Sequence, residues 1–218
     1  MNIEGADPLG ADYDPVARAY AVHFADELRN KPFDTTMLDW LAARVGDLGP
    51  ICDLGCGPGQ VAAYLHARGA AVRGIDLSAA MVGEAAARNP GITFERGDML
   101  DLAGVADESF GGIAAFYAIV NIAPAQLDIA LGEMARVLRP GGTVLLSFHI
   151  GNEVRHLDEL LGVAVTLDFS FVETSVITAK LRGAGLDVTE AIERDPYPEH
   201  VEHQSRRSYV FARKPFAR

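Results

Sequence analysis

Short apolar segments alternate with segments of helical periodicity between residues 50 and 150. The apolar segments predict strands at residues 51–55, 71–76, 92–97, 110–120 and 143–149. Helices of about 10 to 15 residues between successive strands return the chain in the same direction, which makes the sheet parallel. The segment at 110–120 is apolar on both faces, as expected of a central strand that helices cover on both sides. We therefore expect an α/β fold with a doubly wound, mostly parallel sheet.

The chain on either side of this region follows a different pattern. Amphipathic helices are predicted at residues 15–28 and 34–45, whereas residues 151–178 have no clean period. The remaining predicted elements are a helix near 173–183 and strands at 186–194 and 205–213. Neither a repeat nor a low-complexity linker interrupts the chain. The sequence thus predicts one domain with additional segments at its start and after the fifth strand.

The composition agrees with a folded domain and disfavours some partners. Hydrophobic residues make up 49% of the 218 residues, which is enough for a substantial core. The net charge of −11 argues against a long polyanion, because nucleic-acid affinity comes largely from Lys and Arg. A solvated strand edge explains the basic cluster near the C-terminus at least as well; its members are Arg206, Arg207, Arg213, Lys214 and Arg218. We expect no nucleic-acid partner.

The two cysteines and the start of the chain bear on location. Cys52 and Cys56 are too few for a zinc set, and Cys52 lies in an apolar strand segment. Both are interpreted as buried free thiols in a reducing compartment. The acidic first residues lack the basic and apolar regions of a signal peptide, and no segment approaches the roughly 18 apolar residues of a membrane helix. These features predict a cytoplasmic protein with no metal site and no membrane partner.

The stretch ICDLGCGPGQ, residues 51–60, places three glycines directly after the first predicted strand. Ligands of open α/β sheets bind beyond the carboxyl ends of the strands, where the amides of the next helix face them. A nicotinamide dinucleotide and S-adenosylmethionine both suit such a loop. The carboxylate of Asp53 disfavours a pyrophosphate and favours an ammonium or sulfonium group. Gln60 stands where the nicotinamide fingerprint has its third glycine, so both residues favour S-adenosylmethionine.

Two further strand ends carry residues that suit an adenosine. Asp76 ends the second predicted strand, where its two oxygens can accept hydrogen bonds from both ribose hydroxyls of either ligand. Asp98 follows the third strand and can accept from an adenine amino group, while the amide of Met99 can donate to a ring nitrogen. Apolar walls for the adenine are expected from Leu77, Met81 and Met99.

The ordered set DLGCGPG, GIDLS with Met81 after it, GDM and RVLRPGGTVLLSF resembles the class I S-adenosylmethionine-dependent methyltransferases that act on small molecules. The resemblance spans about residues 48–150 and continues more weakly to the end of the chain. It implies a Rossmann-like sheet of seven strands whose C-terminal pair is antiparallel, and S-adenosylhomocysteine as the product. The single domain, 1–218, would then comprise a helical cap (1–45), a cofactor-binding core (48–150), a lid or substrate insertion (151–178) and a closing helix with the strand pair (179–218).

The resemblance also implies roles for individual residues. The loop near the methionine part of the cofactor would consist of Asp53, Gly55, Gly57 and Gly59. Phe116 and Tyr117 would lie near the sulfonium, and Tyr20 resembles an N-terminal aromatic residue that closes over the cofactor. Together with Asp76, Leu77, Met81, Asp98 and Met99, these residues make up the predicted cofactor site.

Methyl transfer is an in-line displacement that needs alignment and exclusion of water, and a base only for hydroxyl or charged amine nucleophiles. His149 ends the fifth predicted strand at the ligand edge and is the first candidate for a catalytic base. Asn121 stands where similar enzymes often carry His, and an amide cannot act as a base. The acceptor pocket is expected to include Tyr13, Tyr117, Asn121 and His156, with His23 as a further candidate.

These features favour an enzyme that transfers a methyl group to an O, N or S atom of a small molecule, and they are compatible with a homodimer. A methyltransferase acting on a protein or another macromolecule is the alternative, although FYAIVN lacks the Asn/Asp-Pro-Pro-aromatic pattern of amino-methylating nucleic-acid enzymes. A non-catalytic S-adenosylmethionine-binding module would be expected to have a damaged loop, whereas every cofactor position is intact.

Overall fold

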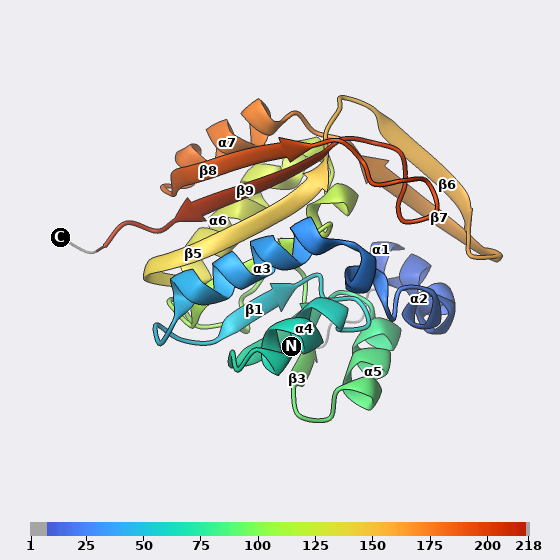
Figure 1. The fold of residues 1–218 in the computed structure, drawn as a ribbon, viewed down its shortest axis with the longest axis horizontal. Coiled ribbons are helices and arrows are strands. Elements are labelled where there is room, and N and C mark those ends of the chain that lie inside the picture. The colour runs from blue at the N-terminus through green and yellow to red at the C-terminus, as the bar shows by residue number, and fades with distance from the viewer. Residues whose placement is uncertain (1–7, 217–218) are drawn as a thin grey trace.

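The computed structural model describes residues 8–216 and contains a seven-stranded sheet with the order β3-β2-β1-β4-β5-β9-β8 (Figure 1). Its strands are β1 (Ile51–Leu54), β2 (Val72–Asp76), β3 (Thr93–Arg96), β4 (Phe110–Phe116), β5 (Leu138–His149), β8 (Asp187–Arg194) and β9 (Arg207–Arg213). The pairings among β1 to β5 are parallel, and β9 is antiparallel to both β5 and β8. The predicted α/β fold with an antiparallel C-terminal pair is therefore confirmed.

Helices cover both faces of this sheet. Helices α3 (Pro32–Val45) and α4 (Gln60–Ala67) bury their apolar residues against one face, in a cluster that includes Leu38 and Leu65. Helices α6 (Leu127–Val137) and α7 (Thr174–Gly183) cover the other face, where Leu131 and Ile177 join a second cluster. Helix α5 (Ala79–Arg88) packs beside β2 and β3. Among residues 8–216 no helix is long and apolar enough to cross a bilayer.

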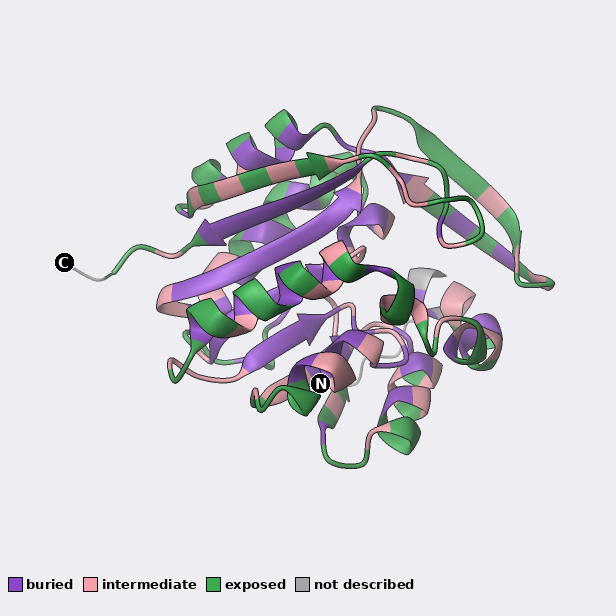
Figure 2. Cartoon of the chain, in the orientation of Figure 1, coloured by how far each residue is buried: buried purple, intermediate pink, exposed green. Residues whose placement is uncertain are grey.

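Strand order reverses between β1 and β4, and this position determines where a ligand can bind. The first strand feeds a crossover toward β2, whereas β4 lies on its other side. The loops after β1 and β4 lie together at the carboxyl edge of the sheet, where ligands of open α/β sheets bind. Strands β1, β4, β5 and β9 are the buried centre of the sheet (Figure 2).

The N-terminal segment is broken into short pieces, so the predicted continuous helix at 15–28 is wrong. It consists of α1 (Pro8–Tyr13), η1 (Asp14–Val16), α2 (Ala17–His23) and η2 (Glu27–Asn30). Because the segment changes direction at these breaks, both η1 and α2 contact α5. The second predicted helix is confirmed as α3, which begins with a proline at its first position.

Residues 154–170 form an antiparallel hairpin that the sequence did not predict. Its strands β6 (Val154–Leu160) and β7 (Val163–Ser170) make a separate sheet beside the main one (Figure 1). Strand β6 is exposed along most of its length (Figure 2). It therefore lacks the apolar and polar alternation that identifies a half-buried strand. On β7, Val165 and Leu167 pack against Val16 and join the hairpin to the N-terminal segment.

Two predicted strand boundaries also differ. Strand β4 ends at Phe116, four residues earlier than predicted, because Tyr117 takes a left-handed conformation with φ of 55° and η3 (Ile119–Asn121) follows. Strand β5 begins at Leu138, five residues earlier than the predicted start at 143, and includes Gly141 at a φ of 82°.

Candidate cofactor and acceptor site

The glycine loop after β1 has a backbone that only glycine adopts easily. Gly55, Gly57 and Gly59 have φ angles of 73°, 51° and 86°. The amide of Gly55 donates to the carbonyl of Ile75 over 2.8 Å, which ties the loop to β2. A Cβ on Gly55 would lie 2.4 Å from the Cβ of Ala118, whereas one on Gly57 would meet no described atom within 4 Å. Gly55 is thus required by packing, and Gly57 borders open space.

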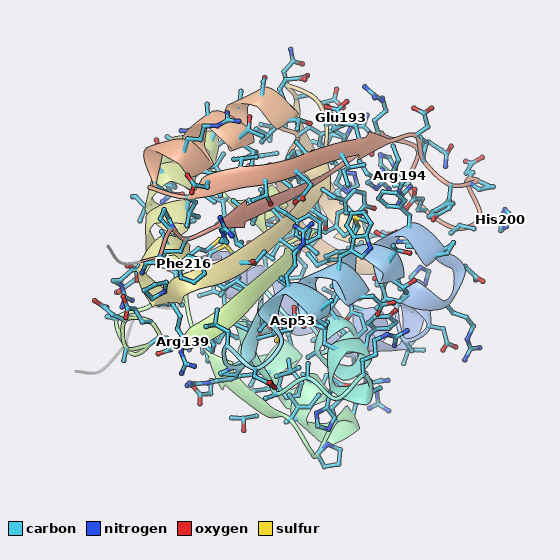
Figure 3. The ribbon with its side chains drawn as sticks, turned by 60° about the vertical axis from the view of Figure 1, so that its left-hand side comes forward. Asp53, Arg139, Glu193, Arg194, His200 and Phe216 are labelled. Carbon is cyan, nitrogen blue, oxygen red and sulfur yellow. The ribbon has the colours of Figure 1, made fainter. Side chains whose placement is uncertain are left out.

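Asp53 lies beneath this loop, in the interior of the molecule (Figure 3). Its carboxylate is 1% exposed and accepts a 2.8 Å hydrogen bond from the amide of Ala62 in the first turn of α4. Burial raises its pKa to about 7, because the charged form loses its hydration. Asp53 therefore joins β1 to the first turn of α4, and these two elements hold the ends of the glycine loop.

Asp76 links the end of β2 to the same loop. One carboxylate oxygen accepts from the amide of Gly57 over 2.8 Å, and the other accepts from the amide of Ser78 over 2.9 Å. Burial raises the pKa of this carboxyl group, and the two amide donors oppose that rise. A carboxylate has about four lone-pair positions, so Asp76 keeps acceptor capacity for hydroxyl groups. Next to it, Leu77 is half-buried, while Met81, in the first turn of α5, is almost fully buried.

Asp98 and Met99 follow β3 and border the loop from the other side. Asp98 accepts a 2.8 Å hydrogen bond from the amide of Leu100, which shapes a tight turn. The methyl group of Met99 would lie 3.4 Å from a Cβ on Gly55. Met99 thus places the loop after β3 against the glycine loop, to which Asp76 joins the end of β2.

The N-terminal segment attaches over this edge. A carboxylate oxygen of Asp14 accepts from the hydroxyl of Ser78 over 2.6 Å and from the amide of Ala80 over 3.1 Å, at the start of α5. The hydroxyl of Tyr13 donates to the side-chain oxygen of Asn121 over 3.0 Å. The rings of Tyr20 and Tyr13 lie 6.4 Å apart, edge to face. Burial raises the pKa of both tyrosines, and the charge of Asp76 contributes to each shift.

Gln60 is a site residue that sequence reasoning used only to distinguish two ligands. It is the first residue of α4, directly after the loop. Its amide nitrogen donates to Glu27 over 3.4 Å, but its buried Oε1 has no hydrogen-bond partner among residues 8–216. A buried acceptor without a donor is uncommon in native structures and calls for a ligand or an ordered water. The unpaired Oε1 marks this end of the loop as a place for a hydrogen-bond donor.

Tyr117 follows β4 in a strained backbone conformation, and several hydrogen bonds fix its position. Its φ of 55° is rare for a bulky residue. Its amide donates to the carbonyl oxygen of Ser147 over 2.9 Å, and its hydroxyl donates to Asp34 over 3.1 Å. The hydroxyl also lies 3.0 Å from that of Tyr209. Phe116 packs edge to face against the Tyr117 ring, so both predicted aromatic residues lie together.

His149 lies beside Tyr117 at the end of β5. The two ring centroids are 5.4 Å apart, and the His149 ring stacks on Phe171 at 5.0 Å with an interplanar angle of 16°. Its Nδ1 is 2.7 Å from the hydroxyl of Ser205. Burial, together with the charge of Arg207, lowers the pKa of His149 to about 3. A general base works best with a pKa near the operating pH, so this imidazole is poorly suited to that role.

His156 and His23 lie apart from this group. The ring of His156 is on exposed β6, with Nδ1 2.7 Å from Asp168 and Nε2 3.2 Å from Asp158. Hydrogen bonding to Asp168 raises its pKa. His156 is thus held in a surface ion pair of the hairpin and not among the residues around Tyr117. His23 is exposed at the end of α2.

A buried charged network behind Tyr117 was missed from the sequence. Asp34 is fully buried and accepts from Arg194 over 3.0 Å and from Tyr209 over 2.6 Å. Arg194, at the end of β8 (Figure 3), also pairs with Glu202. These residues come from α3, β8, β9 and the loop between the last two strands, so no local spacing indicates that they meet.

Comparison with known proteins agrees with this geometry. The family model described as a methyltransferase domain matches residues 51–142. A demethylmenaquinone methyltransferase of Beutenbergia cavernae is 37% identical over 110 residues, which cover 50% of this chain and 44% of the relative. This part of the chain is therefore similar to the methyltransferase domain of S-adenosylmethionine-dependent enzymes. The chain spans about half the length of the curated relatives it matches first.

Solved structures share the fold of this methyltransferase domain. A SAM-dependent methyltransferase from Methanosarcina mazei superposes with a TM-score of 0.68 at 18% identity, covering 77% of this chain and 93% of the other. The [4+2]-cyclase SpnF superposes with a TM-score of 0.62 at 22% identity, covering 84% of this chain and 82% of the other. At such identities the likeness establishes the fold alone.

The residues present fit S-adenosylmethionine, the cofactor of this family. The cofactor carries an ammonium group, which suits the unpaired Oε1 of Gln60, and ribose hydroxyls, which suit Asp76. Gly57 borders open space where a larger residue would stand in the way. A pyrophosphate would instead meet the carboxylates of Asp76 and Asp98 at the strand ends. The donor and acceptor set therefore favours the sulfonium cofactor over a dinucleotide.

Proposed function

We propose that this chain binds S-adenosylmethionine and transfers its methyl group to an O, N or S atom of a small molecule. The observation that carries the proposal is the loop after β1, where three left-handed glycines meet Asp76 beside an unpaired acceptor on Gln60. A phosphate cradle would need donors at these positions. This loop offers acceptors around an open glycine, which suits a cationic amino acid with an attached ribose.

The cofactor is held by the three loops in this proposal. Gln60 accepts from the methionine ammonium, with Asp53 positioning Gly55, Gly57 and Gly59 from below. Asp76 accepts from the ribose hydroxyls. Asp98 and the amide of Met99 bind the adenine edge. The remaining proposed contacts are apolar or aromatic: Leu77, Met81, Met99, Phe116 and Tyr20.

Bound S-adenosylmethionine supplies a methyl carbon that its sulfonium already activates toward displacement. This chain therefore has to align the acceptor and exclude water. Tyr117, Asn121 and Tyr13 line the acceptor side at the ends of β4 and α1. The N-terminal segment and the hairpin cover this edge, since Tyr13 bonds Asn121 and Asn121 donates to the carbonyl of Asp168 over 3.1 Å. In this proposal these contacts keep bulk water away from the reacting atoms.

A protein or other macromolecular acceptor is the alternative, and a non-catalytic cofactor-binding module is a third possibility. The hairpin and the N-terminal segment favour a small acceptor, because both pack over the carboxyl edge. The likeness to a cyclase means that the fold alone does not establish methyl transfer. Activity therefore has to be measured directly.

Isothermal titration calorimetry of the full chain tests cofactor binding. S-adenosylmethionine and S-adenosylhomocysteine should both bind, and NAD should not; binding of NAD alone would overturn the proposal. The acceptor is sought by incubating the chain with methyl-labelled cofactor and a metabolite extract, followed by mass spectrometry. A labelled small molecule supports the proposal, whereas label only in protein or nucleic acid supports the macromolecular alternative.

A further inference from the structure

One ring nitrogen of His149, Nδ1, has a hydrogen-bond partner among residues 8–216, and the other, Nε2, has none. Nδ1 lies 2.7 Å from the hydroxyl oxygen of Ser205, in the loop before β9. No hydrogen bond to Nε2 is formed within residues 8–216, although the ring stacks on Phe171 and contacts Tyr117. Stacking on one side and a hydrogen bond at one end fix the plane of the ring. Nε2 is therefore the atom that remains for a ligand.

The hydroxyl group of Ser205 lies between Arg207 and His149 and has no other hydrogen-bond partner among residues 8–216. The guanidinium of Arg207 donates to both the hydroxyl and the carbonyl oxygen of Ser205, and to the carbonyl oxygen of His203 over 2.7 Å. A guanidinium has donors only, so the Ser205 hydroxyl accepts from it. Among the described residues Nδ1 of His149 is the one acceptor at hydrogen-bond distance from this hydroxyl, so the hydroxyl proton points to Nδ1. In this relay Nδ1 accepts a hydrogen bond and carries no proton.

An imidazole that accepts at Nδ1 carries its single proton on Nε2 when it is neutral. We propose that His149 is held as this tautomer by the Arg207–Ser205 relay, and that it positions the methyl acceptor by donating an Nε2 hydrogen bond to an acceptor oxygen. This inference rests on the function proposed above and replaces the expectation that His149 is a base. An Nε2–H group cannot remove a proton from a nucleophile.

The charges around His149 keep it neutral. Arg207, His203 and Lys31 all disfavour a positive charge on the ring, and only Glu202 favours one. Arg207 and Lys31 also lie over the Tyr117 ring, 5.7 Å and 5.8 Å from its centroid. Burial lowers the pKa of His149 to about 3, so the ring stays uncharged at neutral pH.

The same surroundings indicate the chemistry of the acceptor. A neutral N–H donor between two aromatic rings suits an oxygen with negative charge or a strong dipole, whereas Arg207 and Lys31 are already paired with Glu202 and Glu27. We infer a carbonyl or carboxylate oxygen beside the methylated atom, on an acceptor flat enough to lie along Phe171 and Tyr117. A molecule whose only polar group is an ammonium has no lone pair that could accept from Nε2.

Nitrogen-15 NMR of histidine-labelled full-length protein tests the tautomer without any ligand. The expected spectrum has Nδ1 of His149 in the unprotonated range and Nε2 in the protonated range, unchanged between about pH 5 and pH 8. In Ser205→Ala the relay is broken, so both tautomers should be populated. A proton on Nδ1 in the wild-type protein, or a ring that titrates near neutral pH, would overturn the proposal.

Kinetics with the acceptor recovered from the labelled-methyl experiment separates a donor from a base. His149→Gln keeps an N–H donor, whereas His149→Phe keeps only the stacked ring. A positioning donor predicts that His149→Phe loses about tenfold or more in kcat/KM and that His149→Gln regains part of it. Equal loss of kcat/KM in both variants, with an acid limb in the wild-type pH profile, would show that His149 is a base.

The affinity for S-adenosylhomocysteine, measured by calorimetry, should be unchanged in both variants. Failure of the wild-type protein to bind S-adenosylhomocysteine would refute the proposed function but would not affect the tautomer result.

Discussion

Asp76 carries the cofactor proposal at the scale of a single residue. Its carboxylate already accepts from the amides of Gly57 and Ser78, and the proposal adds the two ribose hydroxyls. Asp76→Ala should therefore weaken S-adenosylhomocysteine binding by about 1.5 to 3 kcal/mol, because charge-assisted hydrogen bonds are lost. Asp76→Asn keeps one acceptor oxygen and should lie between the wild type and the Ala variant. Calorimetry measures all three, and an affinity equal to the wild type in Asp76→Ala would remove Asp76 from the ribose site.

Gly55 and Gly57 make a matched pair two positions apart. Both have left-handed backbones, but only a Cβ on Gly55 would collide with Ala118, at 2.4 Å. Gly57→Ala should lower the free energy of unfolding by about 1 kcal/mol from backbone strain alone. Gly55→Ala should lower it by clearly more, because strain and overlap add.

Urea unfolding compares the two variants, with calorimetry on the same samples. Gly57→Ala should fold and still bind S-adenosylhomocysteine more weakly, since the added methyl group stands in the open space beside the loop. Equal destabilisation by both substitutions would mean that Ala118 can move aside.

Helices and strands whose apolar residues recur at regular spacing were predicted well. The strands between 51 and 149 appear in the predicted order, because the central strands β1, β4 and β5 are largely buried and helices α4, α5 and α6 bury apolar residues. The connection from β3 to β4 contains no helix, although helices were expected between successive strands. The hairpin at 154–170 was not predicted, since exposed β6 is stabilised by pairing with β7 and by contact with the N-terminal segment. The hydrophobic pattern of β6 indicates neither its pairing with β7 nor the contact with the N-terminal segment. Boundaries failed where one residue changes the backbone, as Tyr117 does at the end of β4.

Asp14 decides whether the N-terminal segment stays on the cofactor edge. One oxygen of its carboxylate accepts from the Ser78 hydroxyl and from the Ala80 amide at the start of α5. Asp14→Ala should lower the free energy of local opening by about 1 to 2 kcal/mol, because these hydrogen bonds are lost and the helix start loses a nearby negative charge. Hydrogen exchange followed by mass spectrometry should show roughly 5- to 30-fold faster exchange in α2 and unchanged exchange in β1 and β4.

The matched control is Asp26→Ala, which removes an exposed carboxylate from the same segment together with its surface pair to Arg29. Exposed pairs contribute little, so exchange in α2 should stay as in the wild type. Equal acceleration in both variants, or exchange that rises across the whole chain in Asp14→Ala, would contradict a local attachment through Asp14.

At the scale of the whole molecule, the candidate site divides into a part that local sequence specifies and a part that it does not. The cofactor half lies in loops that directly follow strands, so Asp76 and Asp98 could be placed from topology alone. The acceptor half depends on Asp34 and Arg194, 160 positions apart, and on Arg207 behind Ser205. Only the packing of β8 and β9 against β5 and α3 brings those groups to Tyr117 and His149. Long-range contacts of this kind leave no period in the sequence.

Asp53 gives the stability of the whole chain a dependence on pH. Burial raises its pKa from 3.8 to about 7, so the folded state holds a proton that the unfolded state releases. The stability contributed by the protonated form is present below about pH 4 and is lost as the pH rises to about 7.

Asp53→Asn cannot ionise, and its side-chain oxygen can still accept from the amide of Ala62. The free energy of unfolding of the variant minus that of the wild type should therefore be about 2.5 kcal/mol larger at pH 8 than at pH 5. Urea unfolding at both pH values measures this difference, and taking the difference cancels any effect of the amide that does not depend on pH. Exposed Asp47→Asn serves as the control and should show no such change; the same result for Asp53→Asn would mean that Asp53 is ionised in the folded protein at both pH values.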